Sequence, residues 1–248
     1  MLIEIATTDF ETTRLAVAGG ADRIELCAAL TEGGITTSPS MLKLCRENFS
    51  IPIYPIIRPR AGDFLYTDSE FECMKNDILF CKHLGMDGVV IGALLANGKI
   101  DLVKTEKLIE WAYPMGVTFH RAFDRCLNPY EALEELISLG CERILTSGQK
   151  MTAPEGVALI SELQQQADGR IIIMPGSGVR VDTVEKLALQ TKCVEFHTSL
   201  RDTIESSMAF RHPSFIESKE SYQNPSIEWK AINQIKEILS SVKNEKGN

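Results

Sequence analysis

Residues 140–146 read GCERILT, and the same pattern recurs as GADRIEL at 20–26 and GMDGVVI at 85–91. Each copy contains a glycine, a short gap, an acidic residue and a run rich in apolar, β-forming residues. Glycine readily adopts the left-handed conformation that ends a helix, so each copy predicts a helix end, a tight turn and a new strand. The chain therefore uses one helix-to-strand connector three times.

Eight short segments rich in β-branched residues are spaced for an alternation of strands and helices. They are 2–6, 22–26, 53–59, 87–92, 116–122, 142–148, 171–176 and 194–199. The intervening segments show helical periodicity, and alternating strands and helices pair in parallel through right-handed crossovers. Eight such units in about 200 residues predict an α/β fold, a closed (β/α)8 TIM barrel.

Two predicted helices begin with the same pattern, in which an N-cap residue precedes a proline at the first helical position. Ser38 precedes Pro39, and Asn128 precedes Pro129. An open, doubly wound sheet is the alternative fold, but it usually carries a glycine-rich loop after its first strand. Here the residues ATTDF (6–10) follow that strand, which favours the barrel.

No linker or low-complexity tract divides the chain, so we predict a single TIM-barrel domain over residues 1–248. The barrel core is expected at 1–200 and a C-terminal segment at 201–248. Within that segment, residues 200–225 are polar and predicted to be irregular. Residues 226–242 then have the pattern of an amphipathic closing helix.

Charge and composition exclude several classes of function. The chain has 248 residues and a formal net charge of −8, which argues against nonspecific binding to nucleic acid or to anionic membranes. No signal peptide or membrane-spanning run is recognisable. Seven scattered cysteines without a C-x-x-C pair indicate neither a disulfide framework nor a zinc site. We therefore expect a cytoplasmic protein, although an acidic surface can still hold a basic pocket for an anion.

Active sites of barrels lie at the C-terminal ends of the strands, and side chains alternate along each strand. Glu25 and Cys27 consequently share one face, while Ile24 and Leu26 share the other. Because apolar faces are best placed against the helices, the polar faces should point into the barrel. The same alternation selects Glu4, His120, Glu195 and His197.

Charges inside a barrel are costly unless they are paired. Mutual partners are expected among the carboxylates Glu4, Glu25 and Glu195 and the groups Arg58, His120 and His197. A buried ion-pair layer that only holds the barrel together is the alternative interpretation. The position of these charges at the strand ends favours a functional site.

The segment TFHRAFD (118–124) places ionisable groups where a hydrophobic strand ends. His120 has a reference pKa near 6.5, so it can serve as a general acid or base, with Glu25 as its partner. Arg58 and Arg60 flank a rigid proline, and such guanidinium forks suit a carboxylate or phosphate. The candidate catalytic residues are Glu25, Arg58, His120 and Asp124.

Glycine-rich turns after late strands often bind phosphate in barrels through backbone N–H groups. The stretches LTSG (145–148) and MPGSGV (174–179) fit that pattern, although plain tight turns explain them equally well. The candidate ligand-binding residues are Ser147, Gly176, Gly178 and His197. Cys27 is the cysteine at a strand end facing the interior, so it is the candidate metal ligand or nucleophile; a small buried hydrophobe is the alternative.

These motifs, from GADRIELCAALTEGGITTSPS through PIIRPRAGDFLYTDSE and TFHRAFD to EFHTS, closely resemble the CutC copper homeostasis family. The resemblance runs from residue 2 to about 200. It implies a cytoplasmic TIM barrel, often a homodimer, linked to copper tolerance and trafficking, and it brings no settled reaction. Some members carry a second cysteine at the end of strand one, where this chain has Ala6 and Thr7.

Two hypotheses of function follow. In the first, the chain is a copper homeostasis protein that binds Cu(I) through Cys27, for which one thiol is a small ligand set. In the second, it is a TIM-barrel enzyme that acts on a small phosphorylated or carboxylated metabolite, with His120 and Glu25 as acid and base. A scaffold without catalytic activity would leave the polar interior without a purpose.

Overall fold

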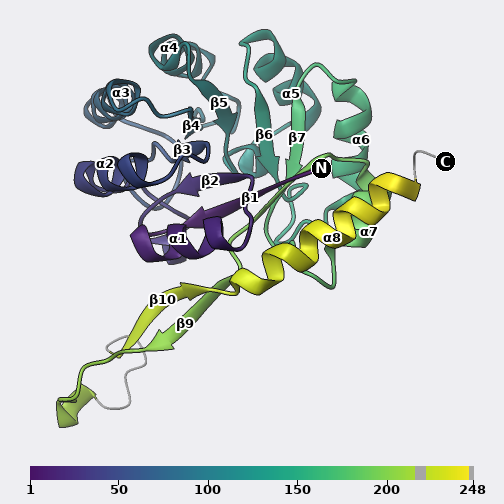
Figure 1. The fold of residues 1–248 in the computed structure, drawn as a ribbon. Coiled ribbons are helices and arrows are strands. Elements are labelled where there is room, and N and C mark those ends of the chain that lie inside the picture. Colours follow the sequence, from purple (N-terminus) through teal and green to yellow (C-terminus); the bar gives the residue numbers. More distant parts are fainter. Residues whose placement is uncertain (216–221, 246–248) are drawn as a thin grey trace.

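The computed structural model describes residues 1–215 and 222–245 (Figure 1). Among these residues, eight parallel strands form a ring in which each strand contacts the next and the eighth returns to the first. The predicted (β/α)8 barrel is thus confirmed. The strands are β1 (Leu2–Thr7), β2 (Arg23–Leu26), β3 (Ile53–Pro55), β4 (Gly88–Ile91), β5 (Gly116–Phe119), β6 (Arg143–Thr146), β7 (Ile172–Pro175) and β8 (Glu195–Thr198).

The ring consists of two ladders, β3-β2-β1-β8 and β4-β5-β6-β7. A parallel bridge between Ile56 and Val90 joins β3 to β4, and β7 lies beside β8. In the first ladder Glu4 is paired with both Arg23 and His197, and Ala6 is paired with Glu25. Paired residues on parallel strands point to the same face, so these side chains share the barrel interior.

Helices cover the outside of the ring (Figure 1). The predicted caps are confirmed, because the Ser38 hydroxyl accepts from Met41 N–H and the Asn128 side chain accepts from Tyr130 N–H. The α-helices are α1 (Phe10–Ala18), α2 (Pro39–Asn48), α3 (Asp68–His83), α4 (Leu102–Ala112), α5 (Pro129–Ser138), α6 (Val157–Ala167), α7 (Val184–Thr191) and α8 (Trp229–Glu245). Short 3-10 turns are η1 (Leu30–Glu32), η2 (Phe123–Arg125) and η3 (Pro213–Phe215).

The main hydrophobic core fills the layer between strands and helices, where Ile3, Ile5, Ile24 and Leu26 are fully buried. A second, small apolar cluster lies elsewhere, formed by Cys27, Tyr54, Ile56 and Val90 with Leu30 against it. Most of these residues alternate with the outward-facing apolar ones, so the second cluster belongs to the barrel interior.

The C-terminal segment differs from its predicted form. Strands β9 (Arg201–Glu205) and β10 (Gln223–Ile227) pair as an antiparallel hairpin that extends away from the barrel (Figure 1). We predicted irregular structure at 200–225; that prediction was wrong for residues 201–205 and 223–225, which form strands, and residues 216–221 lie outside the described residues. All five residues of β9 are exposed, so neither face of this strand needed the apolar alternation by which strands are recognised. The closing helix is confirmed as α8, which packs against α7 and α1.

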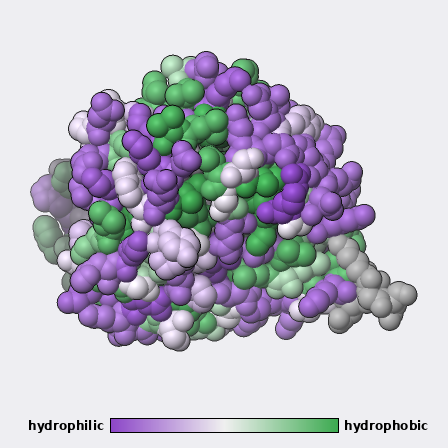
Figure 2. All heavy atoms as spheres, turned by 90° about the horizontal axis from the view of Figure 1, so that it is seen from above, coloured by the Kyte–Doolittle hydropathy of each residue, from purple (hydrophilic) through white to green (hydrophobic). Residues whose placement is uncertain are grey.

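The face shown in Figure 2 is mainly hydrophilic, with hydrophobic side chains gathered near its centre and top among hydrophilic ones. Several large exposed hydrophobic side chains belong instead to the segment after β8, namely Ile204, Met208, Phe210 and Phe215. Among the helices of the described residues, none is both long and apolar enough to span a membrane.

Candidate functional site

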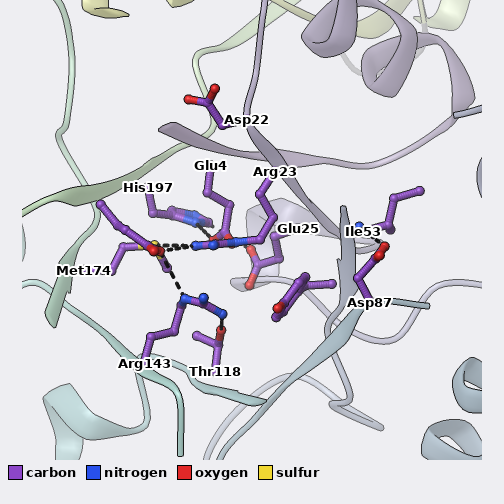
Figure 3. Close-up of polar contacts among 12 residues, drawn as sticks. Glu4, Asp22, Arg23, Glu25, Ile53, Asp87, Thr118, Arg143, Met174 and His197 are labelled. Carbon is purple, nitrogen blue, oxygen red and sulfur yellow. Dashed lines mark hydrogen bonds and ion pairs between the residues drawn. The ribbon is translucent and has the colours of Figure 1, made fainter. Parts of the chain in front are cut away.

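A network of buried charges occupies the barrel interior (Figure 3). Arg23 of β2 donates to the carboxylate of Glu4 on β1, and its Nη2 donates to Glu195 Oε2 on β8 at 2.6 Å. Arg143 of β6 donates from Nε to the same Glu195 oxygen at 3.1 Å. The Glu195 carboxylate therefore joins two guanidinium groups from opposite parts of the ring.

The two arginines of this network are further held by uncharged groups. The Arg143 Nη1 donates to Thr118 Oγ1 at 3.1 Å, and the Arg23 Nη2 lies 3.3 Å from Met174 Sδ. Both guanidinium carbons lie over the Tyr54 ring, at 5.2 Å for Arg23 and 5.1 Å for Arg143 from its centroid. These contacts satisfy buried cations that would otherwise be very unfavourable.

Three side chains on the β8-β1-β2 side of the interior form a line, Glu4–His197–Glu25. The Nδ1 atom of His197 lies 2.7 Å from Glu4 Oε1, and its Nε2 atom lies 3.7 Å from Glu25 Oε2. The second distance exceeds a hydrogen bond. All three groups are buried, with residue exposures of 0% for Glu4, 5% for Glu25 and 8% for His197.

The two carboxylates of this line have opposite electrostatics. Burial favours the protonated form of Glu4, but Arg23 and His197 outweigh it and lower the pKa of Glu4 to about 2. Burial raises the pKa of Glu25 to about 7, and Glu4 adds to that rise while His197 opposes it. Burial also disfavours the charged form of His197, yet the two carboxylates raise its pKa.

The line is arranged for proton exchange near neutral pH. Because Glu4 is ionised, it accepts the Nδ1 proton of His197 and leaves Nε2 directed toward Glu25. One further proton can then reside on Nε2 or on Glu25. A buried carboxyl whose pKa is raised to about 7 beside a histidine whose pKa is also raised is typical of general acid–base sites.

Of the three partners predicted for the interior carboxylates, His197 lies beside Glu4 and Glu25 as expected. Arg58 and His120 instead contact a loop carbonyl and the Ala122 N–H, and Arg23 and Arg143 pair with Glu4 and Glu195 in their place. The physical reason is the stagger of the barrel strands, which brings the first residues of β2 and β6 level with Glu4 and Glu195. Strand alternation applied to β6 as well as to β2 would have selected Arg143.

Arg58 fastens two loops of the barrel mouth. It donates from Nη1 to the carbonyl oxygens of Glu32 at 2.9 Å and Gly34 at 2.8 Å, and from Nη2 to that of Gly62 at 2.8 Å. Its guanidinium also lies 5.0 Å from the centroid of the Phe64 ring. Most of its donors are therefore used to hold the loop after β2 against the loop after β3.

His120 is enclosed between Phe64 and the backbone. Its ring lies 4.8 Å from the Phe64 ring, and its Nδ1 atom accepts from Ala122 N–H at 3.1 Å. Burial and the charge of Arg58 lower the pKa of His120 to about 3, so the ring is neutral at pH 7 with its proton on Nε2. Within the described residues this Nε2, the Arg58 Nε and the Tyr66 hydroxyl are buried without a hydrogen-bond partner.

Asp124 joins the loop after β5 to the loop after β6. Its carboxylate accepts from Thr146 Oγ1 at 2.6 Å, from Ser147 N–H at 3.0 Å, from Gln149 N–H at 3.2 Å and from Arg121 Nε at 2.7 Å. The Ser147 hydroxyl is also engaged, with Arg121 Nη2 2.7 Å away. Both residues consequently position loops, and their polar atoms are occupied by the protein.

The glycines after β7 allow close packing beside the site. A Cβ atom at Gly176, directly after β7, would come within 2.4 Å of the end of the Leu145 side chain and within 3.3 Å of the His197 ring, so a larger residue there would have to displace both side chains. Gly178 has a φ of +75°, a conformation that favours glycine. The turn thus shapes the space around His197, whatever ligand it meets.

Cys27 is fully buried, and its Sγ lies 3.4 Å from the carbonyl oxygen of Thr7. Burial raises the pKa of this thiol far above its usual range, Glu25 adds to the rise, and Arg201 opposes it. In the part of the chain that the structure describes, no group of three or more His, Cys, Asp or Glu side chains could hold a metal ion. The residues around Cys27 therefore fit Cu(I) poorly, since this ion prefers two or three sulfur ligands.

A cleft of about 660 Å³ opens over the C-terminal ends of β1 and β2. One wall is the loop after β2, at residues 29–31, and the other is the β9–β10 hairpin. The lining residues are Ala6, Thr7, Thr8, Thr12, Ala29, Leu30, Thr31, Arg201, Asp202, Thr203, Gln223, Pro225, Ser226 and Ile227. The sequence offered no sign of this cleft, because the hairpin that encloses it was not predicted.

Comparisons with known proteins agree with this fold. The sequence model of the CutC family matches residues 1–202. A CutC family protein of Parabacteroides distasonis is 50% identical over 212 residues, which are 85% of this chain and 87% of that protein. The human copper homeostasis protein cutC homolog is 46% identical over 213 residues, which are 86% of this chain and 78% of that protein.

A solved structure gives the same result. The crystal structure of a copper homeostasis protein CutC from Streptococcus agalactiae has a TM-score of 0.76 and 31% identity to this chain. The matched region spans 80% of this chain and 98% of the Streptococcus agalactiae chain. Sequence and structure therefore agree, and the chain belongs to the CutC family.

Proposed function

We propose that this protein is a TIM-barrel enzyme that transfers protons on a small anionic metabolite, with Glu25 and His197 as the acid–base pair. The observation that carries the proposal is the line Glu4–His197–Glu25, with separations of 2.7 Å and 3.7 Å. It lies on strands of a barrel, whose enzymes carry their catalytic groups at the C-terminal ends of such strands.

Each residue of the line has a distinct role. Ionised Glu4 holds His197 in one orientation and stabilises its protonated form, as the third member of a catalytic triad does. Glu25, whose pKa is about 7, takes a proton from one substrate atom while His197 returns a proton to another. Such a pair suits isomerisation or elimination, in which protons move without an external oxidant or reductant.

This proposal replaces one member of the pair that the sequence suggested. Glu25 stays, but His197 takes the place of His120, whose ring is neutral and enclosed by Phe64. The roles of Arg58 and Asp124 are to position loops, which supports a pocket without requiring contact with substrate.

A metabolite screen followed by kinetics tests the proposal. Thermal shift at pH 7 selects ligands of the wild-type protein, and these are then assayed for turnover by NMR. Glu25→Gln and His197→Asn are each expected to lower kcat about 10²–10⁴-fold while ligands still bind. His120→Asn is the matched control and should keep most of the turnover. Full activity of Glu25→Gln would refute the acid–base role.

Copper binding stays a separate hypothesis. The human relative is named a copper homeostasis protein, and Cys27 offers one soft ligand. Because Cys27 belongs to no group of three or more His, Cys, Asp or Glu side chains among the described residues, we expect anaerobic Cu(I) titration against a chelator to find no submicromolar site, and Cys27→Ser to behave like wild type. A submicromolar site that is lost in Cys27→Ser would instead establish copper as the ligand.

A homodimer and a cytoplasmic location are further proposals. The dimer is supported by the β9–β10 segment, which exposes Ile204, Met208 and Phe210. An isolated two-stranded hairpin is marginally stable in water, so a second copy that covers it would stabilise it. The location is supported by the scattered cysteines, which form no disulfides in the structure.

A further inference from the structure

The cleft between the barrel and the β9–β10 hairpin is formed by the connection between β8 and α8. The loops that follow barrel strands carry the ligand contacts of TIM-barrel enzymes, and the connection after β8 is the one that forms this hairpin (Figure 1). The cleft volume of about 660 Å³ lies within the usual range of small-molecule sites, about 300–1,000 Å³. Both position and size are those of a ligand site.

The floor of the cleft lies next to the proposed acid–base pair. Ala6 lines the cleft and is the direct neighbour of Glu25 across the β1–β2 ladder. Cys27 directly follows β2, and the charges of both Glu25 and Arg201 act on its thiol. A ligand that contacts Ala6 in the cleft therefore lies beside the strand position of Glu25.

Arg201 is the one cation among the lining residues. It is exposed, and its guanidinium has no hydrogen bond or ion pair with the residues that the structure describes. Asp202 also lines the cleft, and its Oδ1 accepts from the N–H of Thr203 at 2.8 Å instead of pairing with Arg201. The guanidinium group of Arg201 is therefore free to donate hydrogen bonds to a carboxylate or phosphate group.

The rest of the lining is neutral and of two kinds. Leu30, Pro225 and Ile227 supply apolar surface, and Thr31 and Ser226 supply hydroxyl groups. A macromolecular partner that is recognised by charge would need several basic groups, whereas this cleft has one. An organic molecule with a single anionic group and a small apolar or hydroxylated body matches the lining.

We propose that this cleft binds a small organic anion, a carboxylate or a phosphate monoester, whose charged group pairs with Arg201. The direction of the bound molecule, with its reacting part toward Glu25, rests on the function proposed above. Binding itself does not depend on that function, because Arg201 and the apolar wall lie outside the acid–base line.

Two model compounds serve as probes, phenyl phosphate and benzoate, with benzyl alcohol as the uncharged counterpart. Their affinities are measured by NMR titration with wild type, Arg201→Gln and Arg211→Gln. Arg211 is the matched control, because it belongs to the same segment but pairs with Glu205 at 2.7 Å. We expect Arg201→Gln to weaken the anionic probes at least tenfold, Arg211→Gln to have no effect, and benzyl alcohol to bind all three proteins equally weakly.

The comparison of the two anions separates phosphate from carboxylate as the preferred group. Equal affinity of wild type and Arg201→Gln, or no binding to either, would overturn the proposal. Sedimentation velocity on the same samples shows whether a second copy fills the cleft; a dimer that Arg201→Gln dissociates would also overturn it. Glu25→Gln should bind the probes as wild type does, so the acid–base proposal can fail while the anion site stands.

Discussion

Replacement of Arg23 by methionine is expected to lower the free energy of unfolding by about 3–5 kcal/mol. Arg23 is 4% exposed and neutralises two carboxylates, those of Glu4 and Glu195. Removal of one member of a buried ion pair leaves an uncompensated charge, which costs far more than the net contribution of the pair. Here the variant removes one cation from two buried carboxylates at once, which leaves Glu4 with His197 and Glu195 with Arg143.

Urea denaturation at pH 7, followed by circular dichroism, measures this loss. The matched control is Arg170→Met, which removes an arginine from an exposed pair with Glu134 and should change the midpoint little. Arg23→Lys keeps the charge but loses the two-pronged geometry, so it should fall between wild type and Arg23→Met. If Arg23→Met unfolds at the wild-type midpoint, the network contributes nothing to stability.

Glu25→Gln is expected to raise the free energy of unfolding at pH 8, whereas Glu4→Gln lowers it. The pKa of Glu25 is about 7 in the fold and near 4.5 when unfolded. Between these values the folded state keeps a proton that the unfolded state has released. The free energy of unfolding of the wild type therefore falls as pH rises from about 5 to above 7. In Glu25→Gln the group that titrates is gone, so this part of the pH dependence is absent.

The sign for Glu4 is opposite. Its pKa of about 2 in the fold lies below the unfolded value of 4.5, so its contribution is present above pH 4.5 and is lost as pH falls toward 2. Glu4→Gln lacks that contribution at neutral pH and also leaves Arg23 and His197 without their common partner.

Unfolding free energies of the three proteins at pH 5, 6, 7 and 8 test both signs. Glu25→Gln should keep a smaller decline, because His197, with its raised pKa, also loses stability as pH rises. A parallel decline in wild type and Glu25→Gln would show that Glu25 does not titrate in this range. Equal stability of Glu4→Gln and wild type at pH 8 would contradict the role of Glu4.

Several parts of the fold were predictable from short-range signals. The connectors such as GCERILT locate β2, β4 and β6, and proline after Ser38 and Asn128 locates two helix starts. Alternation along β8 and β2 also placed His197 and Glu25 inside the barrel. These features depend on the local backbone conformation and on side-chain periodicity, and both are determined by residues that are neighbours in the sequence.

The hairpin and the ionic partners were not predictable in this way. The β9 strand is exposed on both faces, so its sequence lacks the alternation that marks a strand. Arg23 and Met174 are in contact although 151 positions separate them, and Arg143 meets Glu195 across 52 positions. Contacts of this kind depend on how far each strand is shifted along the ring.

The sequence by itself determined the order of strands and helices, the barrel, and the set of polar side chains that point inward, because periodicity of two and glycine or proline signals are local. Only the tertiary structure decided which carboxylate meets which cation, that His197 rather than His120 stands beside Glu25, and that the hairpin encloses a cleft. The physical reason is that strand stagger and loop packing set both the distances between residues far apart in the chain and their burial, and the strength of an electrostatic interaction depends on both.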